Sequence, residues 1–173
     1  MLLVASYVFY GSWDWRFLSL ILASTIVGYF VAQKMEAEPL QQRRKLLLGI
    51  SLSANLGILG VFKYLGFFAD SFQALLQGIG YSADPITLSI ILPVGISFYT
   101  FQTLGYSIDV YRREIRSESD FLNFALFVAF FPQLVAGPIE RAKNLLPNIQ
   151  LPRTLSWDAL RRGAVLCALG LIK

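Results

Sequence analysis

Long apolar runs constrain the fold of this chain more than any other feature. A membrane-spanning helix needs roughly 17–25 mostly apolar residues, and several of the runs approach that length. Only 15% of the 173 residues are charged, well below the roughly one quarter typical of soluble domains. The length of the runs disfavours the alternative, a buried helical core of a soluble protein. We predict an all-α, polytopic transmembrane protein with apolar runs at Phe17–Ala32, Leu46–Phe62, Ile86–Ile108, Phe121–Ala136 and, shorter than a span, Leu160–Ile172.

The basic residues lie in the segments between these runs, a pattern typical of loops that stay on the cytoplasmic side. It places Gln33–Lys45 and Arg112–Arg116 inside and Asp70–Asp84 outside. The net charge of +4 does not come from a basic stripe with interleaved aromatic residues, so no nucleic-acid partner is expected. We expect a multi-pass protein whose main surroundings are the lipid bilayer.

Several residues mark the expected ends of the spans. Met1–Tyr10 is apolar but too short to cross, and Trp13 and Trp15 flank Asp14 in the manner of an interfacial aromatic belt. Lys63 should end the second span, because a lysine at the bilayer centre costs roughly 3 kcal/mol. The stretch that follows, YLGFFADSFQALLQGIGYSADP, is expected to lie at the interface or to form a short helix.

The stretch FFPQLVAGPIER interrupts the fourth run. Pro132, Gly137 and Pro138 break a helix, and at membrane depth such backbone is tolerated only where protein buries it or where it lines a cavity. The next segment, Gly137–Arg162, holds five basic and two acidic residues, which places it inside as well. We therefore predict that Phe121–Ala136 is re-entrant and returns to the cytoplasmic side. The alternative is an ordinary span followed by a basic external loop.

The stretch LPVGISFYTFQTLGYSIDVYRRE is the second unusual segment. Pro93 and Gly95 are expected to loosen its helix. Beyond them, helical spacing places four polar side chains on one face. Such a face either bonds to neighbouring helices or lines a wet cavity, and the pattern leaves both possibilities open. The four side chains are Tyr99, Gln102, Thr103 and Tyr106.

No set of residues with catalytic spacing is visible. Asp109 and Arg112 are three positions apart and form either an interfacial ion pair or a solvated helix end. Ser97 has no nearby base, and the chain contains no histidine, metal-ligand cluster or phosphate loop. Its single cysteine, Cys167, excludes an internal disulfide and is expected to be a small buried hydrophobic residue. The residues alone do not separate an enzyme from a transporter, a channel-like subunit or a non-catalytic assembly partner.

The two unusual segments do resemble a known family. PVGISFYTFQTLGYSIDVYR followed by FFPQLVAGPIER resembles the paired motifs of the membrane-bound O-acyltransferases. The likeness is greatest to the bacterial branch that contains alginate O-acetyltransferase and the teichoic-acid D-alanyltransferase subunit. The opening stretch, ASYVFYGSWDWRF, is similar to that branch too. The resemblance covers nearly the whole chain, from Leu3 to Lys173.

The resemblance implies a ring of transmembrane helices around a tunnel in the bacterial inner membrane. An acyl group, commonly acetyl, would pass from a cytoplasmic thioester, either acetyl-CoA or an acyl carrier, to hydroxyls of an external polysaccharide, with no bound cofactor. Polysaccharide-modification proteins would be partners. The family's base is a histidine in a later helix, and this chain has none. Residues 1–173 are therefore expected to form one membrane domain, the N-terminal part of a longer acyltransferase domain truncated at both ends and inactive alone.

No catalytic residue carries over from the family. The resemblance gives the two segments a scaffold role, as tunnel wall and cytoplasmic approach for the donor. Arg141 is the most specific candidate, since a guanidinium suits a donor phosphate; the alternative is contact with lipid headgroups. The residues assigned to the tunnel or to the structural motif are Pro93, Gly95, Ser97, Phe98, Tyr99, Gln102, Tyr106, Asp109, Pro132, Gln133, Gly137, Pro138 and Arg141.

Overall fold

Helices form all the regular structure in the part of the chain described by the computed structural model, which is residues 1–78, 93, 95–134, 137–151 and 156–172. No strand occurs within these ranges, which confirms the predicted all-α fold class. In chain order the elements are α1 (Leu2–Gly11), the 3₁₀ turn η1 (Trp15–Phe17), α2 (Leu18–Ala37), α3 (Gln41–Gly78), α4 (Ile96–Tyr111), α5 (Phe121–Ala129), α6 (Phe131–Leu134), α7 (Ala142–Gln150) and α8 (Trp157–Ile172).

Two helices of the described ranges are long and apolar enough to cross a bilayer. They cover Trp15–Ala37 and Gln41–Tyr64 and contain the first two predicted runs. Trp13 and Trp15, at the start of the first span, are largely exposed, as residues of an interfacial belt should be. Of the third predicted run, residues 86–92 and 94 lie outside the described ranges.

The boundary predicted for the second span is confirmed to within two residues, since the apolar span in α3 ends at Tyr64. The helix itself, however, does not end at Lys63. α3 continues through this residue to Gly78 as a single helix. The Lys63 ammonium lies 5.6 Å from the centroid of the Tyr64 ring, and the side chain is exposed. A long lysine side chain can move its charge toward water without breaking the backbone. Of the predicted outer segment Asp70–Asp84, residues 79–84 lie outside the described ranges.

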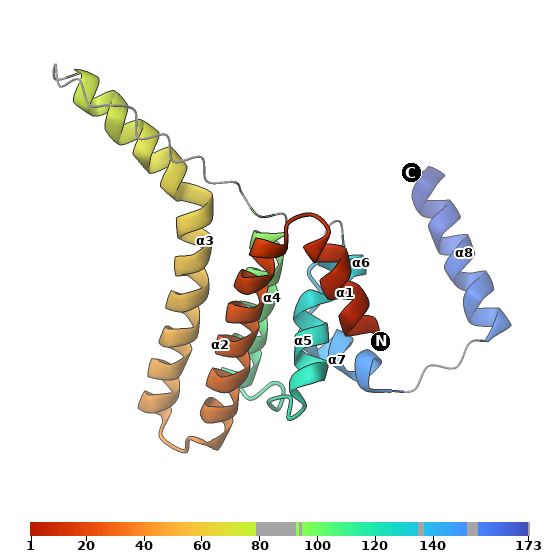
Figure 1. Cartoon of the computed structure of the whole chain (residues 1–173). Helices are drawn as coiled ribbons and strands as arrows, with labels where there is room; N and C mark the ends of the chain where they lie inside the picture. Colours follow the sequence, from red (N-terminus) through yellow and green to blue (C-terminus); the bar gives the residue numbers. More distant parts are fainter. Residues whose placement is uncertain (79–92, 94, 135–136, 152–155, 173) are drawn as a thin grey trace.

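α2, α3 and α4 lie side by side and pack pairwise (Figure 1). Short polar side chains near the middle of these helices form hydrogen bonds from one helix to another. The Ser24 hydroxyl donates to Oδ1 of Asn55 at 2.6 Å and lies 3.3 Å from the Thr103 hydroxyl. The hydroxyls of Ser51 and Ser107 are 2.9 Å apart. Toward α2 and α3, therefore, the polar side chains of α4 hydrogen-bond between helices rather than line a cavity.

A buried arginine closes one end of this three-helix layer. Arg44, in the first turns of α3, is 2% exposed. Its Nη1 donates to the carbonyl of Met35 at 2.7 Å, and its Nη2 donates to the carbonyls of Val110 and Tyr111 at 3.0 and 2.9 Å. These carbonyls belong to the last turns of α2 and α4, where main-chain acceptors have no partner within the helix and a positive charge is favoured.

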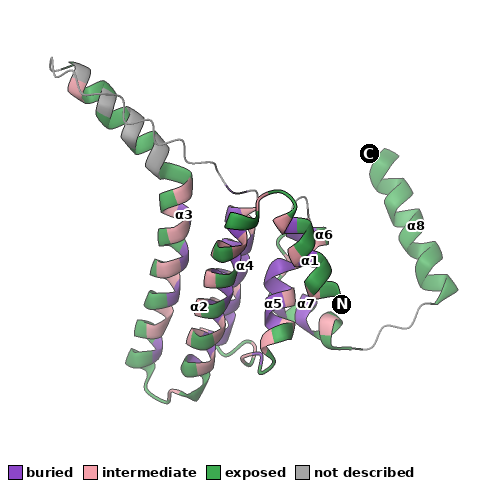
Figure 2. Ribbon diagram, in the orientation of Figure 1, coloured by how far each residue is buried: buried purple, intermediate pink, exposed green. Residues whose placement is uncertain are grey.

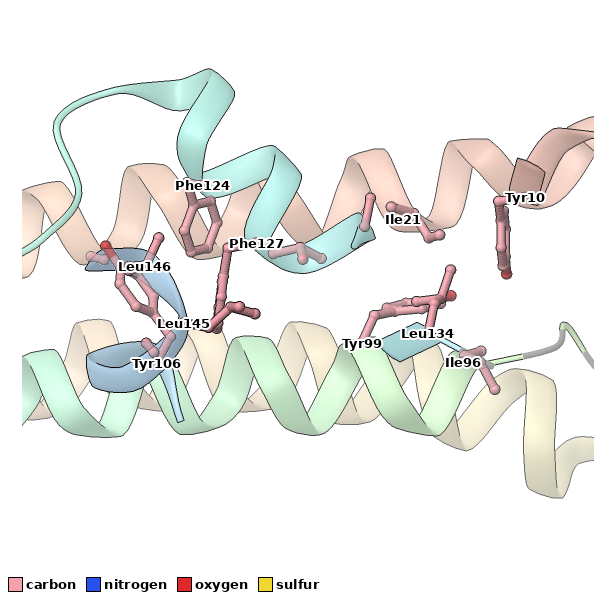
Figure 3. Packing of buried hydrophobic residues seen from close by; sticks show 14 of the residues in the cluster. Tyr10, Ile21, Ile96, Tyr99, Tyr106, Phe124, Phe127, Leu134, Leu145 and Leu146 are labelled. Carbon is pink, nitrogen blue, oxygen red and sulfur yellow. The ribbon is translucent and has the colours of Figure 1, made fainter. Parts of the chain in front are cut away.

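α1, α5, α6 and α7 form a second layer against α2 and α4. Figure 2 shows that the buried residues concentrate where the two layers meet. Figure 3 shows the buried side chains in two groups along α4. One group gathers Tyr106 with Phe124 and Phe127, and the ring centroids of Tyr106 and Phe124 are 4.6 Å apart. The other gathers Tyr10, Ile21, Ile96, Tyr99 and Leu134.

α8 stands apart from both layers (Figure 1), and every one of its residues is exposed. Cys167 lies on this helix and is a free, exposed cysteine. The expectation that it is a buried hydrophobic residue is therefore wrong. Because α8 packs on no described part of the chain, Cys167 is not buried in a protein interior.

Candidate functional site

The apolar run that Pro132 interrupts begins at Phe121, at one end of the helical layers. From there α5 and α6 run beside α4 toward the other end (Figure 1). α5 starts at an N-cap in which Asp120 accepts a hydrogen bond from the Leu122 N–H at 2.8 Å. It ends at Phe130, whose ψ of 103° is extended. Pro132 lies in the first turn of α6, where its missing N–H costs no helical bond. The break predicted at this proline is thus a break between two short helices.

α6 reaches the opposite end of α4 and packs on Gly95. A Cβ at this glycine would lie 2.9 Å from the carbonyl oxygen of Leu134. Gly95 also has φ of 76° and is the N-cap of α4, a conformation that favours glycine. Pro93 and Gly95 therefore precede this helix and start it, rather than loosening its interior as predicted.

The segment then returns to the end from which it rose. At its turn, a Cβ on Gly137 would lie 2.6 Å from the Cα of Gln133, and Gln133 donates from Nε2 to the Pro138 carbonyl at 3.3 Å. Gln150, the last residue of α7, hydrogen-bonds from its side chain to the carboxylate of Glu118, just before α5. Both ends of segment 121–150 therefore lie together (Figure 1), which agrees with the expected re-entrant course.

A cavity of about 280 Å³ lies where the returning segment meets the end of α4. The two segments singled out in the sequence, residues 92–114 and 130–141, thus come together at one place. From α4 and its end the cavity is lined by Phe101, Gln102, Gly105, Tyr106, Ile108, Asp109 and Arg112, and from the returning segment by Ile139, Glu140, Arg141 and Ala142.

Two buried acceptors on the cavity wall have no partner in the described part of the chain. Gln102 is 2% exposed and donates from Nε2 to the Phe127 carbonyl at 2.7 Å, but its Oε1 accepts no bond. Asp109 is 5% exposed, and its Oδ2 accepts no bond. Buried polar atoms without partners are costly, and these two oxygens belong to residues that line the cavity.

Glu118, in the loop before α5, contacts the cavity residue Tyr106 and was not identified from the sequence. It is 7% exposed. Its main-chain N–H donates to the Tyr106 hydroxyl at 2.8 Å, and its Oε1 accepts from the Asp120 N–H at 3.0 Å. Gln33 of α2 and Gln150 of α7 also donate to it. One residue therefore joins α2, α4 and α7 to the N-cap of α5, and no local pattern in the loop sequence marks it.

The charges at the mouth of the cavity decide between the two alternatives left open for Asp109 and Arg112. Nη1 of Arg112 lies 3.8 Å from Oε1 of Glu114, and Nη1 of Arg141 lies 3.9 Å from Oε2 of the same carboxylate. Arg112 thus pairs with Glu114 at an exposed helix end, and no ion pair between Arg112 and Asp109 forms among the described residues. Glu114 is the last residue of the second unusual segment and was given no role in the sequence analysis.

The predicted site residues separate into two groups. Gln102, Tyr106, Asp109 and Arg141 line the cavity. Tyr99 and Gln133 are buried away from it, with Tyr99 near Leu134 in Figure 3. The remaining members do not line the cavity: Pro93, Gly95, Ser97, Phe98, Pro132, Gly137 and Pro138.

The whole chain matches curated bacterial enzymes. It is 40% identical to a probable alginate O-acetylase of Pseudomonas putida, over 100% of the chain and 36% of that protein. It is 38% identical to a probable alginate O-acetylase of Pseudomonas aeruginosa, over 100% of the chain and 33% of that protein. It is 33% identical to a peptidoglycan O-acetyltransferase of Helicobacter pylori, over 99% of the chain and 37% of that protein.

The chain therefore spans about a third of the length of the curated relatives that it matches. No family model matches it, and no solved structure matches it.

Proposed function

We propose that this chain, which belongs to the membrane-bound O-acyltransferase family with the O-acetyltransferases that it matches, forms the donor side of a membrane O-acyltransferase. The full-length protein would move an acyl group, acetyl by analogy with those relatives, to hydroxyls of an extracytoplasmic polysaccharide. The donor is a cytoplasmic thioester. The observation that carries the proposal is the cavity at which the two family-like segments meet.

The reaction needs a base that these residues do not contain. The acceptor hydroxyl oxygen bonds to the thioester carbonyl carbon, the carbon–sulfur bond breaks, and the sulfur leaves as a thiol. A general base takes the hydroxyl proton as the oxygen attacks. Residues 1–173 contain no histidine, so we assign this base to a part of the protein outside them. The contribution of this chain is to bind and orient the donor.

The cavity has the chemistry that a thioester donor requires. Acetyl-CoA and acyl carriers both hold the thioester on a phosphopantetheine arm, which has amide N–H donors, methyl groups and a phosphate. Gln102 and Asp109 line the cavity and each has a buried acceptor oxygen without a partner in the described part of the chain, which a small side-chain rotation would turn toward the amides. Phe101 and Ile108 give apolar wall. Arg112 and Arg141 offer guanidinium groups to the phosphate at the mouth.

This assignment fixes the orientation of the protein. The end of the layers that holds the cavity faces the cytoplasm, and the end that holds Trp13 and Trp15 faces outward, in the bacterial inner membrane. We propose that the remaining helices of the full-length protein complete the tunnel around residues 1–173, which form one part of a single domain. Polysaccharide-modification proteins would meet the outer end.

The test is the donor kinetics of the full-length protein with Arg141→Ala. Loss of one charge-assisted hydrogen bond is worth roughly 1.5–3 kcal/mol in favourable geometry. Arg141 is largely exposed, so the lower limit applies, and the apparent KM for the acyl donor should rise about tenfold with little change in kcat.

Arg43→Ala is the matched control. Arg43 forms an exposed pair with Glu38 at 3.8 Å and does not line the cavity, so its removal should leave donor kinetics unchanged. An Arg141→Ala enzyme that is expressed normally and keeps the wild-type KM for the donor would contradict the proposed role of the cavity.

A further inference from the structure

We propose that Glu114 is a resident anion that competes with the acyl donor for Arg112 and Arg141. The inference rests on the proposed function, since it assumes that the cavity admits a phosphate-bearing ligand. The carboxylate oxygens of Glu114 lie 3.8 Å and 3.9 Å from one guanidinium nitrogen each. A phosphate that bridged the same two arginines would occupy the place of this carboxylate.

The backbone fixes Glu114 in this place. The N–H of Glu114 donates to the carbonyl of Asp109 at 2.9 Å, and the N–H of Arg113 donates to the carbonyl of Val110 at 3.0 Å. These two bonds define a Schellman C-cap. Its left-handed position is held by Arg113, with φ of 61°, where glycine is usual. A non-glycine residue in this conformation is uncommon, and such outliers concentrate at functional sites.

The contacts of Glu114 suit an exchangeable anion better than a structural one. The side chains of Arg112, Arg141 and Glu114 are 62%, 61% and 38% exposed. Exposed ion pairs at these distances add little to stability. An incoming phosphate can therefore displace the carboxylate without unfolding the loop, and it has to do so to reach both arginines.

The net charge around the cavity depends on Glu114. Two acidic and two basic side chains line the cavity, so their charges cancel. Of the two acidic ones, Glu140 is engaged by the Asn144 amide at 3.2 Å, and Asp109 is buried. Glu114 adds one negative charge at the mouth, so removing its charge leaves the mouth neutral. The lining side chains that cancel are Asp109, Glu140, Arg112 and Arg141.

The experiment measures binding of inorganic pyrophosphate to the detergent-purified full-length protein by isothermal titration calorimetry at low ionic strength. Glu114→Gln should bind pyrophosphate about fivefold more tightly than wild type, the effect of one unit charge at about 4 Å in water. Glu38→Gln is the matched control, because Glu38 also pairs with an exposed arginine at 3.8 Å but lies away from the cavity. Its affinity should equal that of wild type.

A second variant locates the bound probe. In Glu114→Gln combined with Arg141→Ala, the gain in affinity should disappear; a gain that persists means that pyrophosphate binds elsewhere and overturns the proposal. Equal or weaker binding by Glu114→Gln, or no binding by any folded variant, overturns it as well. None of these outcomes depends on catalysis, so the donor kinetics of Arg141→Ala still decide the proposed function separately.

Discussion

Nη2 of Arg44 donates to the main-chain carbonyl of Val110 at 3.0 Å, across 66 positions of sequence. The same guanidinium holds the carbonyls of Met35 and Tyr111. The planar fork of arginine reaches acceptors in different directions at once, which a lysine ammonium on a single flexible stem does not reproduce. The end of the three-helix layer therefore depends on one side chain that is 2% exposed.

We predict that Arg44→Ala lowers the free energy of unfolding by roughly 3–5 kcal/mol, because it leaves buried carbonyls without a donor. Arg44→Lys should recover less than half of this loss. The measurement is the thermal unfolding midpoint of the full-length protein in detergent. Arg43→Ala, at an exposed neighbour, should stay within about 0.5 kcal/mol of wild type. If Arg44→Ala unfolded at the wild-type temperature, the guanidinium would have no role in joining the helices.

Gly95→Ala should destabilise the docking of α6 on α4. The substitution places a Cβ 2.9 Å from the Leu134 carbonyl oxygen in a left-handed conformation that costs an L-residue roughly 1–2 kcal/mol. We expect a loss of at least this size in unfolding free energy. Gly57→Ala is the control, since a Cβ there meets nothing within 4 Å, and alanine in a helix should be neutral or stabilising. Equal effects of the two substitutions would contradict the close packing at Gly95.

Arg113→Gly should raise the unfolding free energy by up to about 1 kcal/mol, because glycine adopts the positive φ of this position without steric cost. A small gain is expected since glycine also loses more chain entropy on folding. Arg116→Gly, in the same loop, has no positive φ to relieve and should give no gain. A destabilised Arg113→Gly protein would show that the arginine side chain contributes more than its backbone strain costs.

Cysteine labelling tests the return of segment 121–150. In a Cys167→Ser background, which removes the exposed native thiol, Lys143→Cys and Arg116→Cys should react with a membrane-impermeant maleimide only after the inner face is opened. Trp13→Cys, 71% exposed in the native residue, should react from outside in intact cells. Reaction of Lys143→Cys from outside would instead favour an ordinary span with a basic external loop.

The sequence was sufficient where apolar length and local chemistry decide the structure. α2 and α3 follow from the length of their apolar runs, and the break between α5 and α6 follows from Pro132. The return of segment 121–150 was predicted from the charges around it rather than from any helix pattern. The joining of its far end to α4 through Gly95 was not predicted, because a positive φ and a close contact are not visible in composition.

The sequence was insufficient where a side chain acts far from its own position. Arg44 was counted only as a basic loop residue, yet it bonds to carbonyls up to 67 positions away. Glu114 and Glu118 lie in a short polar loop that carries no motif. The continuation of α3 beyond the second span was missed, because the stretch after Lys63 was expected to lie at the interface or to form a short helix of its own.

Because segment 121–150 begins and ends at the same end of the bundle, no hydrophilic loop has to be carried across the bilayer between α4 and α7 during synthesis. Its first two helices, α5 and α6, together contain 13 residues, fewer than an inserting span requires. Their place in the membrane is therefore created by helices made earlier. Gly95 and α4 must already be in place before α6 has a surface on which to dock, so an error in the insertion of α4 would also distort the cavity between α4 and the returning segment.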